Sequence, residues 1–124
     1  MKRLFFAACL MVLPGWATAD NCDAPNLTGF DSVYCFSKVY IGEDNRLNAN
    51  YQELRRKLSS ADRATLRNAQ LSWISWRDAT CMTGPTTVNV DCALDVTRTR
   101  ADFLSARIVE CNSVGCATSK LTQY

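Results

Sequence analysis

The sequence predicts an all-α fold, in which a small disulfide-linked helical hairpin is joined by a third helix to make a three-helix bundle. Apolar residues recur every three or four positions over three long stretches, which is the spacing of one helix face. Short polar segments with turn-forming residues separate these stretches. The chain has 124 residues, 48% of them hydrophobic, which is enough for one domain with one modest core.

The N-terminus has the layout of a secretory signal peptide. A basic start precedes an apolar run over residues 4–13, and Ala17-Thr18-Ala19 provides a small-x-small cleavage site. The apolar run is too short to cross a membrane. The sequence therefore predicts a signal peptide at residues 1–19 and a single helical domain at residues 20–124.

Cysteine usage indicates an exported, disulfide-bonded product. One of the seven cysteines, Cys9, lies in the predicted signal peptide, which leaves an even number in the mature chain. Disulfides form in oxidising compartments, so we expect the protein to be periplasmic or secreted. Neither Cys9 nor Cys22 has the preceding leucine and small residues of a lipoprotein cysteine, so no membrane anchor is expected. The mature cysteines are Cys22, Cys35, Cys81, Cys92, Cys111 and Cys116.

Charge and missing residue types exclude several kinds of site. Cleavage would lower the formal charge of +2 to zero, because the removed segment holds two basic residues and no acid. A neutral chain does not favour nucleic acid or an anionic membrane as partner. The chain has no histidine, the usual general base, and its cysteine spacing does not fit a zinc site. Its glycines are isolated, so no phosphate-binding loop occurs. We therefore expect no enzyme, metal or cofactor.

The first helix should follow an irregular lead over residues 20–28 and begin at a cap formed by Asp31 or Ser32. Gly42 interrupts its apolar stripe and costs roughly 1 kcal/mol relative to alanine, so it is a candidate for a kink or break. A turn is expected at residues 58–60. The stripe comprises Val33, Phe36, Tyr40, Leu47, Tyr51, Leu54 and Leu58.

The second helix should start at Ser59, which forms a capping signal with Asp62 three residues later. It should run to about Cys81. Gly84-Pro85 then marks residues 82–90 as a loop.

The third helix should be capped by Asn89 or Asp91 and end at the segment 111–116. The tail to Tyr124 is polar and is expected to be loose. The apolar stripe of this helix comprises Leu94, Thr97, Ala101, Leu104, Ile108 and Cys111.

This layout limits which cysteines can pair. Cys111 lies nineteen residues after Cys92, roughly 28 Å along a helix, whereas a disulfide needs Cα atoms within about 7 Å. Cys111 therefore pairs most simply with Cys116. The other four cysteines belong to the open end of the hairpin and allow three pairings, of which we prefer Cys35–Cys81 with Cys22–Cys92.

The second predicted helix carries the motif Ala69-Gln70-x-x-Trp73-Ile74-x-x-Arg77-Asp78 and ends on Cys81. With an upstream segment over residues 47–54, this motif resembles the lysozyme-inhibitor LprI family of bacterial envelope proteins. The resemblance implies an exported helical domain, and named members inhibit lysozyme. The chain departs from the family by Trp76 and by the Cys111/Cys116 pair. The matching positions are Leu47, Asn48, Tyr51, Leu54, Leu66, Ala69, Gln70, Trp73, Ile74, Arg77, Asp78, Cys81, Cys92 and Arg98 or Arg100.

Most of the motif is expected to serve packing. Trp73 should pack into the hairpin, and Asn48 and Gln70 should satisfy each other or a helix end. Arg77 has three candidate carboxylate partners, namely Asp31, Asp78 and Asp95. The mainly structural set is Leu47, Asn48, Tyr51, Gln70, Trp73 and Arg77.

Two functions from different classes remain. The first is an immunity-type protein that inhibits lysozyme or another cell-wall hydrolase. The alternative is a structural or stress-related envelope protein that inhibits nothing. The feature that discriminates between them is a protruding segment able to enter a cleft, and residues 82–90 are the candidate.

Candidate partner-binding residues lie in and near this segment. Cys81 and Cys92 hold its ends, so it can enter a cleft with little loss of chain entropy. Trp76 lies on a different helix face from Trp73 and should point outward, as tryptophans that anchor interfaces do. Two acids early in the third helix supply local negative charge for a basic enzyme. The candidates are Trp76, Met82, Gly84, Pro85, Asp91 and Asp95.

Overall fold

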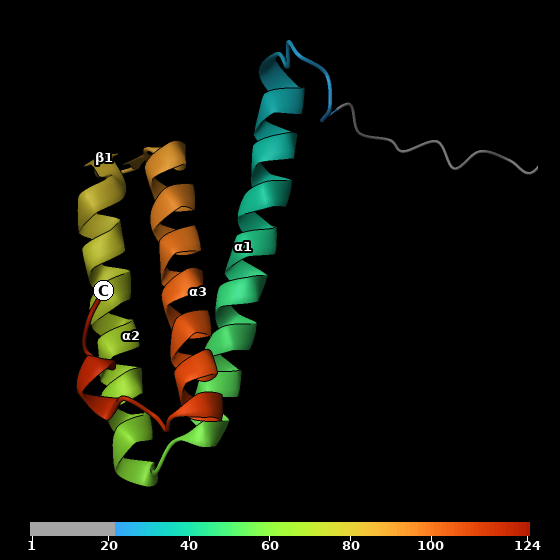
Figure 1. Ribbon diagram of the computed structural model, residues 1–124. Helices are drawn as coiled ribbons and strands as arrows, with labels where there is room; N and C mark the ends of the chain where they lie inside the picture. Colours follow the sequence, from blue (N-terminus) through green and yellow to red (C-terminus); the bar gives the residue numbers. More distant parts are fainter. Residues whose placement is uncertain (1–21) are drawn as a thin grey trace, which may run out of the picture. The chain divides into compact units, whose positions relative to one another are not determined.

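The computed structural model describes residues 22–124, and its helices confirm the predicted all-α class. The predicted signal peptide lies outside the described residues. The chain divides into two compact units, one ending at Cys35 and one running from Phe36 to Tyr124. In chain order the elements are α1 Gly29–Lys57, α2 Ser60–Cys81, β1 Met82–Gly84, β2 Thr87–Val88, α3 Val90–Ser113 and the 3₁₀ helix η1 Thr118–Lys120 (Figure 1).

In the first unit, α1 begins at Gly29 rather than at a cap on Asp31 or Ser32. Gly29 has a φ of +45°, a left-handed conformation that glycine adopts without steric cost. The backbone N–H of Asp31 donates to the carbonyl of Thr28 at 3.0 Å. Asp31 thus lies inside the first turn, where its carboxylate interacts favourably with the helix dipole.

The second unit contains the rest of α1, and this helix continues through Gly42, so the candidate break at this residue does not occur. A single glycine weakens a helix but removes no backbone hydrogen bond. The same stretch of helix is supported by the ion pair between Glu43 and Arg46 at 2.7 Å. No atom lies within 4 Å of the position that a Cβ on Gly42 would occupy, so no packing contact requires glycine there.

The predicted caps of α2 and α3 are confirmed. The Oγ of Ser59 accepts a hydrogen bond from the N–H of Asp62 at 3.2 Å, and α2 ends at Cys81. The Oδ1 of Asn89 accepts from the N–H of Cys92 at 3.0 Å and so starts α3. Both caps satisfy backbone donors that a helix start leaves unpaired.

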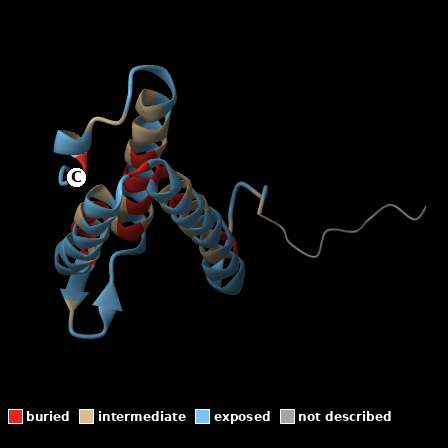
Figure 2. Cartoon of the chain, turned by 90° about the horizontal axis from the view of Figure 1, so that it is seen from below, coloured by how far each residue is buried: buried red, intermediate tan, exposed pale blue. Residues whose placement is uncertain are grey.

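The core of the second unit lies between the three helices, and Figure 2 shows buried residues gathered where they meet. Trp73 of α2 is its largest side chain and is 2% exposed. On the first unit's part of α1, by contrast, Val33 of the predicted stripe is exposed. The buried core residues are Leu47, Leu54, Leu58, Leu66, Trp73, Ala101, Leu104 and Leu121.

Residues 82–90 were expected to be a loop but contain a β-hairpin. Strands β1 and β2 are antiparallel, with Met82 opposite Val88 and Gly84 opposite Thr87. The backbone N–H of Asn89 also donates to the carbonyl of Cys81 at 2.8 Å. These hydrogen bonds give a defined shape to a segment whose strands are too short to produce a recognisable alternation in the sequence.

The tail after α3 is ordered, which corrects the expectation of a loose segment. Leu121 is 1% exposed and belongs to the core. The Nζ of Lys120 donates to Glu110 Oε1 at 2.8 Å, and the tail returns along α2 (Figure 1). The buried leucine and the ion pair therefore help to fix a segment whose sequence is mainly polar.

The preferred pairings Cys35–Cys81 and Cys22–Cys92 are wrong. The observed disulfides are Cys22–Cys35, Cys81–Cys92 and Cys111–Cys116, so only the last was predicted. Equal distance from a turn places two residues at the same height on a hairpin, but it does not set their lateral separation. Local reversals of the chain bring the paired cysteines together. The β-hairpin places the Cα atoms of Cys81 and Cys92 5.5 Å apart, and the lead before α1 places the Cα atoms of Cys22 and Cys35 5.4 Å apart.

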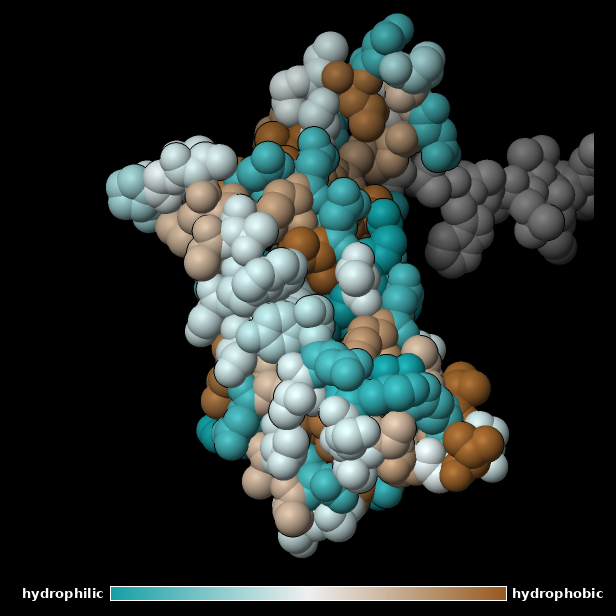
Figure 3. All heavy atoms as spheres, turned by 60° about the vertical axis from the view of Figure 1, so that its left-hand side comes forward, coloured by the Kyte–Doolittle hydropathy of each residue, from teal (hydrophilic) through white to brown (hydrophobic). Residues whose placement is uncertain are grey.

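The surface drawn in Figure 3 is mixed, with hydrophobic residues in small patches among hydrophilic ones. Within residues 22–124, no helix combines the length and the apolar character that a bilayer span requires.

Candidate functional site

The motif on α2 is organised around the buried ring of Trp73. The side chain of Gln70, one turn earlier, accepts a hydrogen bond at Oε1 from Nε of Arg100 on α3 at 3.0 Å. The expected pair between Asn48 and Gln70 does not form. Asn48 is exposed and donates instead to Asp44 Oδ2 at 3.0 Å, because residues four apart on one helix are neighbours.

Arg77 finds one of its three expected carboxylates. Its Nε and Nη2 both donate to Oδ1 of the adjacent Asp78, at 2.9 and 2.7 Å. Its guanidinium also lies over the Trp73 ring, 5.4 Å from the centroid, which is cation–π geometry. The arginine is thereby held between a buried aromatic ring and an exposed acid.

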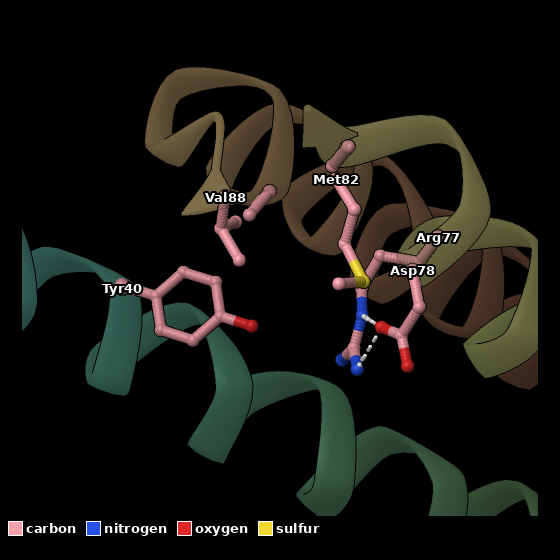
Figure 4. A pocket seen from close by; sticks show the side chains of 7 residues that line it. Tyr40, Arg77, Asp78, Met82 and Val88 are labelled. Atoms are coloured by element: carbon pink, nitrogen blue, oxygen red, sulfur yellow. Dashed lines mark hydrogen bonds and ion pairs between the residues drawn. The ribbon is translucent and has the colours of Figure 1, made fainter. Parts of the chain in front are cut away.

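A pocket of about 270 Å³ opens beside this pair, where α1, α2, the β-hairpin and α3 come together. Figure 4 shows the Tyr40 hydroxyl and the Arg77 guanidinium directed into the same space, with Met82 and Val88 on its hairpin side. The pocket thus offers a hydroxyl, a cation–carboxylate pair and two apolar side chains. Its lining residues are Tyr40, Arg77, Asp78, Cys81, Met82, Val88 and Ala93.

An ion-pair network joins α1 to α3 one helical turn from Tyr40. Arg46 donates from Nε to Glu43 Oε2 at 2.8 Å and from Nη1 to Asp102 Oδ1 at 2.6 Å. Nε of Arg98 contacts Glu43 Oε1 at 3.4 Å. The hydrogen bond from Arg46 is the main cause that lowers the pKa of Glu43, so this carboxylate stays charged at neutral pH. The network holds the Tyr40 wall of the pocket against α3.

The hairpin presents apolar side chains to solvent from a fixed frame. Met82 and Val88 face each other across the strands and are 42% and 49% exposed. The Cys81–Cys92 bridge closes the base of the hairpin. Of the other predicted partner-binding residues, Pro85 and Asp91 are exposed and Gly84 is half-buried. Asp95 is also exposed and forms a long ion pair of 3.9 Å with Arg98.

Trp76 is separated from this group. Its ring is 41% exposed, as expected, but it contacts the ring of Tyr124 with centroids 5.9 Å apart. The two residues line a second pocket that shares no residue with the first. The structure therefore brings Met82, Arg77 and Asp78 together and places Trp76 elsewhere.

Two residues that shape these pockets were not predicted as site residues. Tyr40 was expected only as a member of the apolar stripe, yet its hydroxyl reaches the hairpin pocket. Arg100 was one of two alternative family positions, yet it is almost fully buried. Over the described residues, no cluster of cysteine, aspartate or glutamate side chains has the arrangement of a metal site.

Comparison with known proteins bears on the same region of the chain. The profile of the family described as Lysozyme inhibitor LprI matches residues 22–104, which include α1, α2 with its motif, the hairpin and the first part of α3. No curated protein sequence matches significantly, and no solved structure does. The family match covers more than half of the chain, and the chain belongs to the lysozyme inhibitor LprI family.

Proposed function

We propose that this protein is exported and inhibits a lysozyme or another cell-wall hydrolase by inserting the β1–β2 hairpin into the enzyme's cleft. The main support for this proposal is the hairpin, which exposes Met82 and Val88 while the Cys81–Cys92 bridge fixes its base. A segment that is already ordered loses little conformational entropy on binding. Family membership supports a hydrolase as the partner.

Charge near the hairpin suits a basic enzyme. Asp78, Asp91 and Asp95 are exposed around its base, and Arg77 neutralises only the first of them at short range. A mature chain without net charge attracts a basic protein weakly at long range, so this local group would carry the complementarity. The pocket bounded by Tyr40 and Arg77 would receive a side chain from the rim of the enzyme's cleft.

Export is supported by the signal-peptide layout at residues 1–19 and by the three disulfides. A periplasmic or secreted location would place the protein beside the cell wall, where it could protect the cell as an immunity-type factor. Its action would be binding alone, with no chemistry on a substrate.

The test is an inhibition assay against a panel of muramidases. Met82→Ser/Val88→Ser should raise the inhibition constant at least about tenfold, because exposed anchors at the centre of an interface carry most of its energy. Replacing residues 82–88 with a Gly/Ser linker should abolish inhibition while the helical circular dichroism is kept. Leu71→Ala, on an exposed position of α2 outside both pockets, is the matched control.

Two results would change this assignment. Full inhibition by the linker variant would move the inhibitory surface elsewhere, with Trp76 as the next candidate. Failure of the native protein to inhibit any muramidase would favour the alternative, a structural or stress-related envelope protein.

A further inference from the structure

Arg100 is a buried cation whose hydrogen bonding is incomplete. It is 1% exposed, its Nε donates to Gln70 Oε1 at 3.0 Å, and its Nη1 donates to the carbonyl of Gln123 at 2.9 Å. Its Nη2 is buried and has no acceptor. Among residues 22–124, no carboxylate forms an ion pair with it. Arg100 is therefore a buried positive charge with no ion-pair partner among residues 22–124, and a coulombic interaction with Tyr124 only partly offsets the effect of burial on its pKa.

This arrangement is costly for the folded protein. Burial lowers the pKa of Arg100 to about 10, so the group is still charged at neutral pH. Three aromatic rings partly compensate, with centroids 5.9 Å (Trp73), 4.9 Å (Phe103) and 5.9 Å (Tyr124) from the guanidinium carbon. Rings stabilise a cation but accept no conventional hydrogen bond, so they leave Nη2 unsatisfied.

The same rings form the walls of a pocket of about 230 Å³ that Arg100 lines. Trp76, Val96 and Phe103 give it a mainly apolar surface, and Thr99 adds a hydroxyl. No acidic residue contributes to the lining. The volume lies below the roughly 300–1,000 Å³ of pockets for drug-sized ligands, so the pocket fits a molecule with one ring or one branched chain.

We propose that this pocket binds a small organic carboxylate with an aromatic or branched apolar body. The carboxylate would accept a hydrogen bond from Nη2 of Arg100, and the body would pack against Trp76 and Phe103. Nη2 is covered in the free protein, so the half-exposed ring of Tyr124 would move outward to admit the acid. An inorganic anion would satisfy the charge but would leave the aromatic walls without a contact.

The pocket is independent of the proposed inhibitory surface, because no residue lines both sites. Binding here should therefore persist in the hairpin variants, whether or not the protein inhibits a muramidase.

A titration followed by NMR tests the proposal with phenylacetate and its uncharged isostere phenylacetamide. Phenylacetate should shift the indole Nε1–H signals of Trp73 and Trp76 to saturation, and phenylacetamide should bind at least about tenfold more weakly, since loss of one charge-assisted hydrogen bond is worth roughly this much. Acetate, which lacks the apolar body, should also bind at least tenfold more weakly. Equal affinity for the acid and the amide, or no saturable shift, would overturn the proposal.

Variants locate the interaction. Arg100→Met should abolish the preference for the acid, and methionine suits the site because replacing a buried charge by an apolar side chain of similar length is often tolerated. Arg98→Met, on an exposed position of the same helix, removes a cation that does not line this pocket, so it should leave the preference for phenylacetate unchanged. If Arg100→Met does not fold, Trp76→Ala should weaken phenylacetate binding at least tenfold, with Leu71→Ala as its matched control. Unchanged phenylacetate binding in folded Arg100→Met or in Trp76→Ala would overturn the site.

Discussion

Trp73 and Trp76 lie one turn apart on α2 and have different environments, since the first is 2% and the second 41% exposed. We expect Trp73→Ala to lower the free energy of unfolding by about 3–5 kcal/mol, because it removes the largest side chain of the core. Trp76→Ala should cost less than about 1 kcal/mol, since it loses mainly its contact with Tyr124. Urea unfolding measures both values. A larger loss of unfolding free energy for Trp76→Ala than for Trp73→Ala would contradict the assignment of Trp73 to the buried face of α2.

Glu110 links α3 to the tail through two cations. Its Oε1 accepts from Nζ of Lys120 at 2.8 Å and from Nη2 of Arg107 at 2.7 Å. The hydrogen bond from Lys120 is the main cause that lowers the pKa of Glu110, and partial burial opposes it. A carboxylate with a lowered pKa in the folded state stabilises the fold above its unfolded pKa, and this contribution disappears as the pH falls through the folded value.

We therefore expect Glu110→Gln to be less stable than the native protein at neutral pH, and the gap to close as the pH falls from neutral into the acidic range and through the lowered pKa of Glu110. Thermal unfolding of both proteins across this range measures the gap. Glu53→Gln removes a similar carboxylate from α1 and serves as a comparison. The hydrogen bond from Arg56 is the main cause that lowers the pKa of Glu53. A gap between Glu110→Gln and the native protein that stays constant with pH would contradict the assigned ion pairs.

At the scale of elements, the three disulfides each close a short local segment, with sequence separations of 13, 11 and 5 residues. Peptide mapping of the oxidised protein without reduction should recover Cys22–Cys35, Cys81–Cys92 and Cys111–Cys116. Thiol counting on the folded protein should find none of these six cysteines free. Recovery of a Cys35–Cys81 peptide would contradict the observed connectivity.

The boundaries of α2 and α3 could be predicted because short-range hydrogen bonds set them. Ser59 with Asp62, and Asn89 with Cys92, are signals that lie within four residues of sequence. The start of α1 depends on the left-handed Gly29, and the β-hairpin has strands too short for a period to be detected. The start of α1 and the β-hairpin could therefore not be predicted from the pattern of apolar residues.

The candidate sites were less predictable than the helices, for a different reason. Trp73 could be assigned to the core from its spacing, but burial of Arg100 depends on aromatic rings contributed by α2, α3 and the tail. Charged residues are almost never fully buried without a partner, so a lone arginine is ordinarily expected at the surface. Only the assembled packing shows otherwise.

At the scale of the second unit, the tail completes the core rather than trailing from it. Leu121 is almost fully buried among residues of the three helices. We expect Leu121→Ala to lower the free energy of unfolding by about 2–5 kcal/mol, as for other buried leucines, whereas the exposed neighbour Thr122→Ala should have little effect. Differential scanning calorimetry compares the two variants. Equal melting temperatures would show that the tail contributes nothing to the core.

The order of the bridges has a consequence for how the chain matures. In residues 22–124, each disulfide joins a cysteine to the next one in the sequence, so no bridge encloses another cysteine or spans another bridge. A chain that emerges N-terminus first can therefore oxidise its cysteines two at a time, each pair closing before the following one appears. Pairing neighbours in order of appearance yields the native connectivity directly. A thiol oxidase is then sufficient for maturation, and disulfide exchange by an isomerase becomes necessary only when a pair is missed.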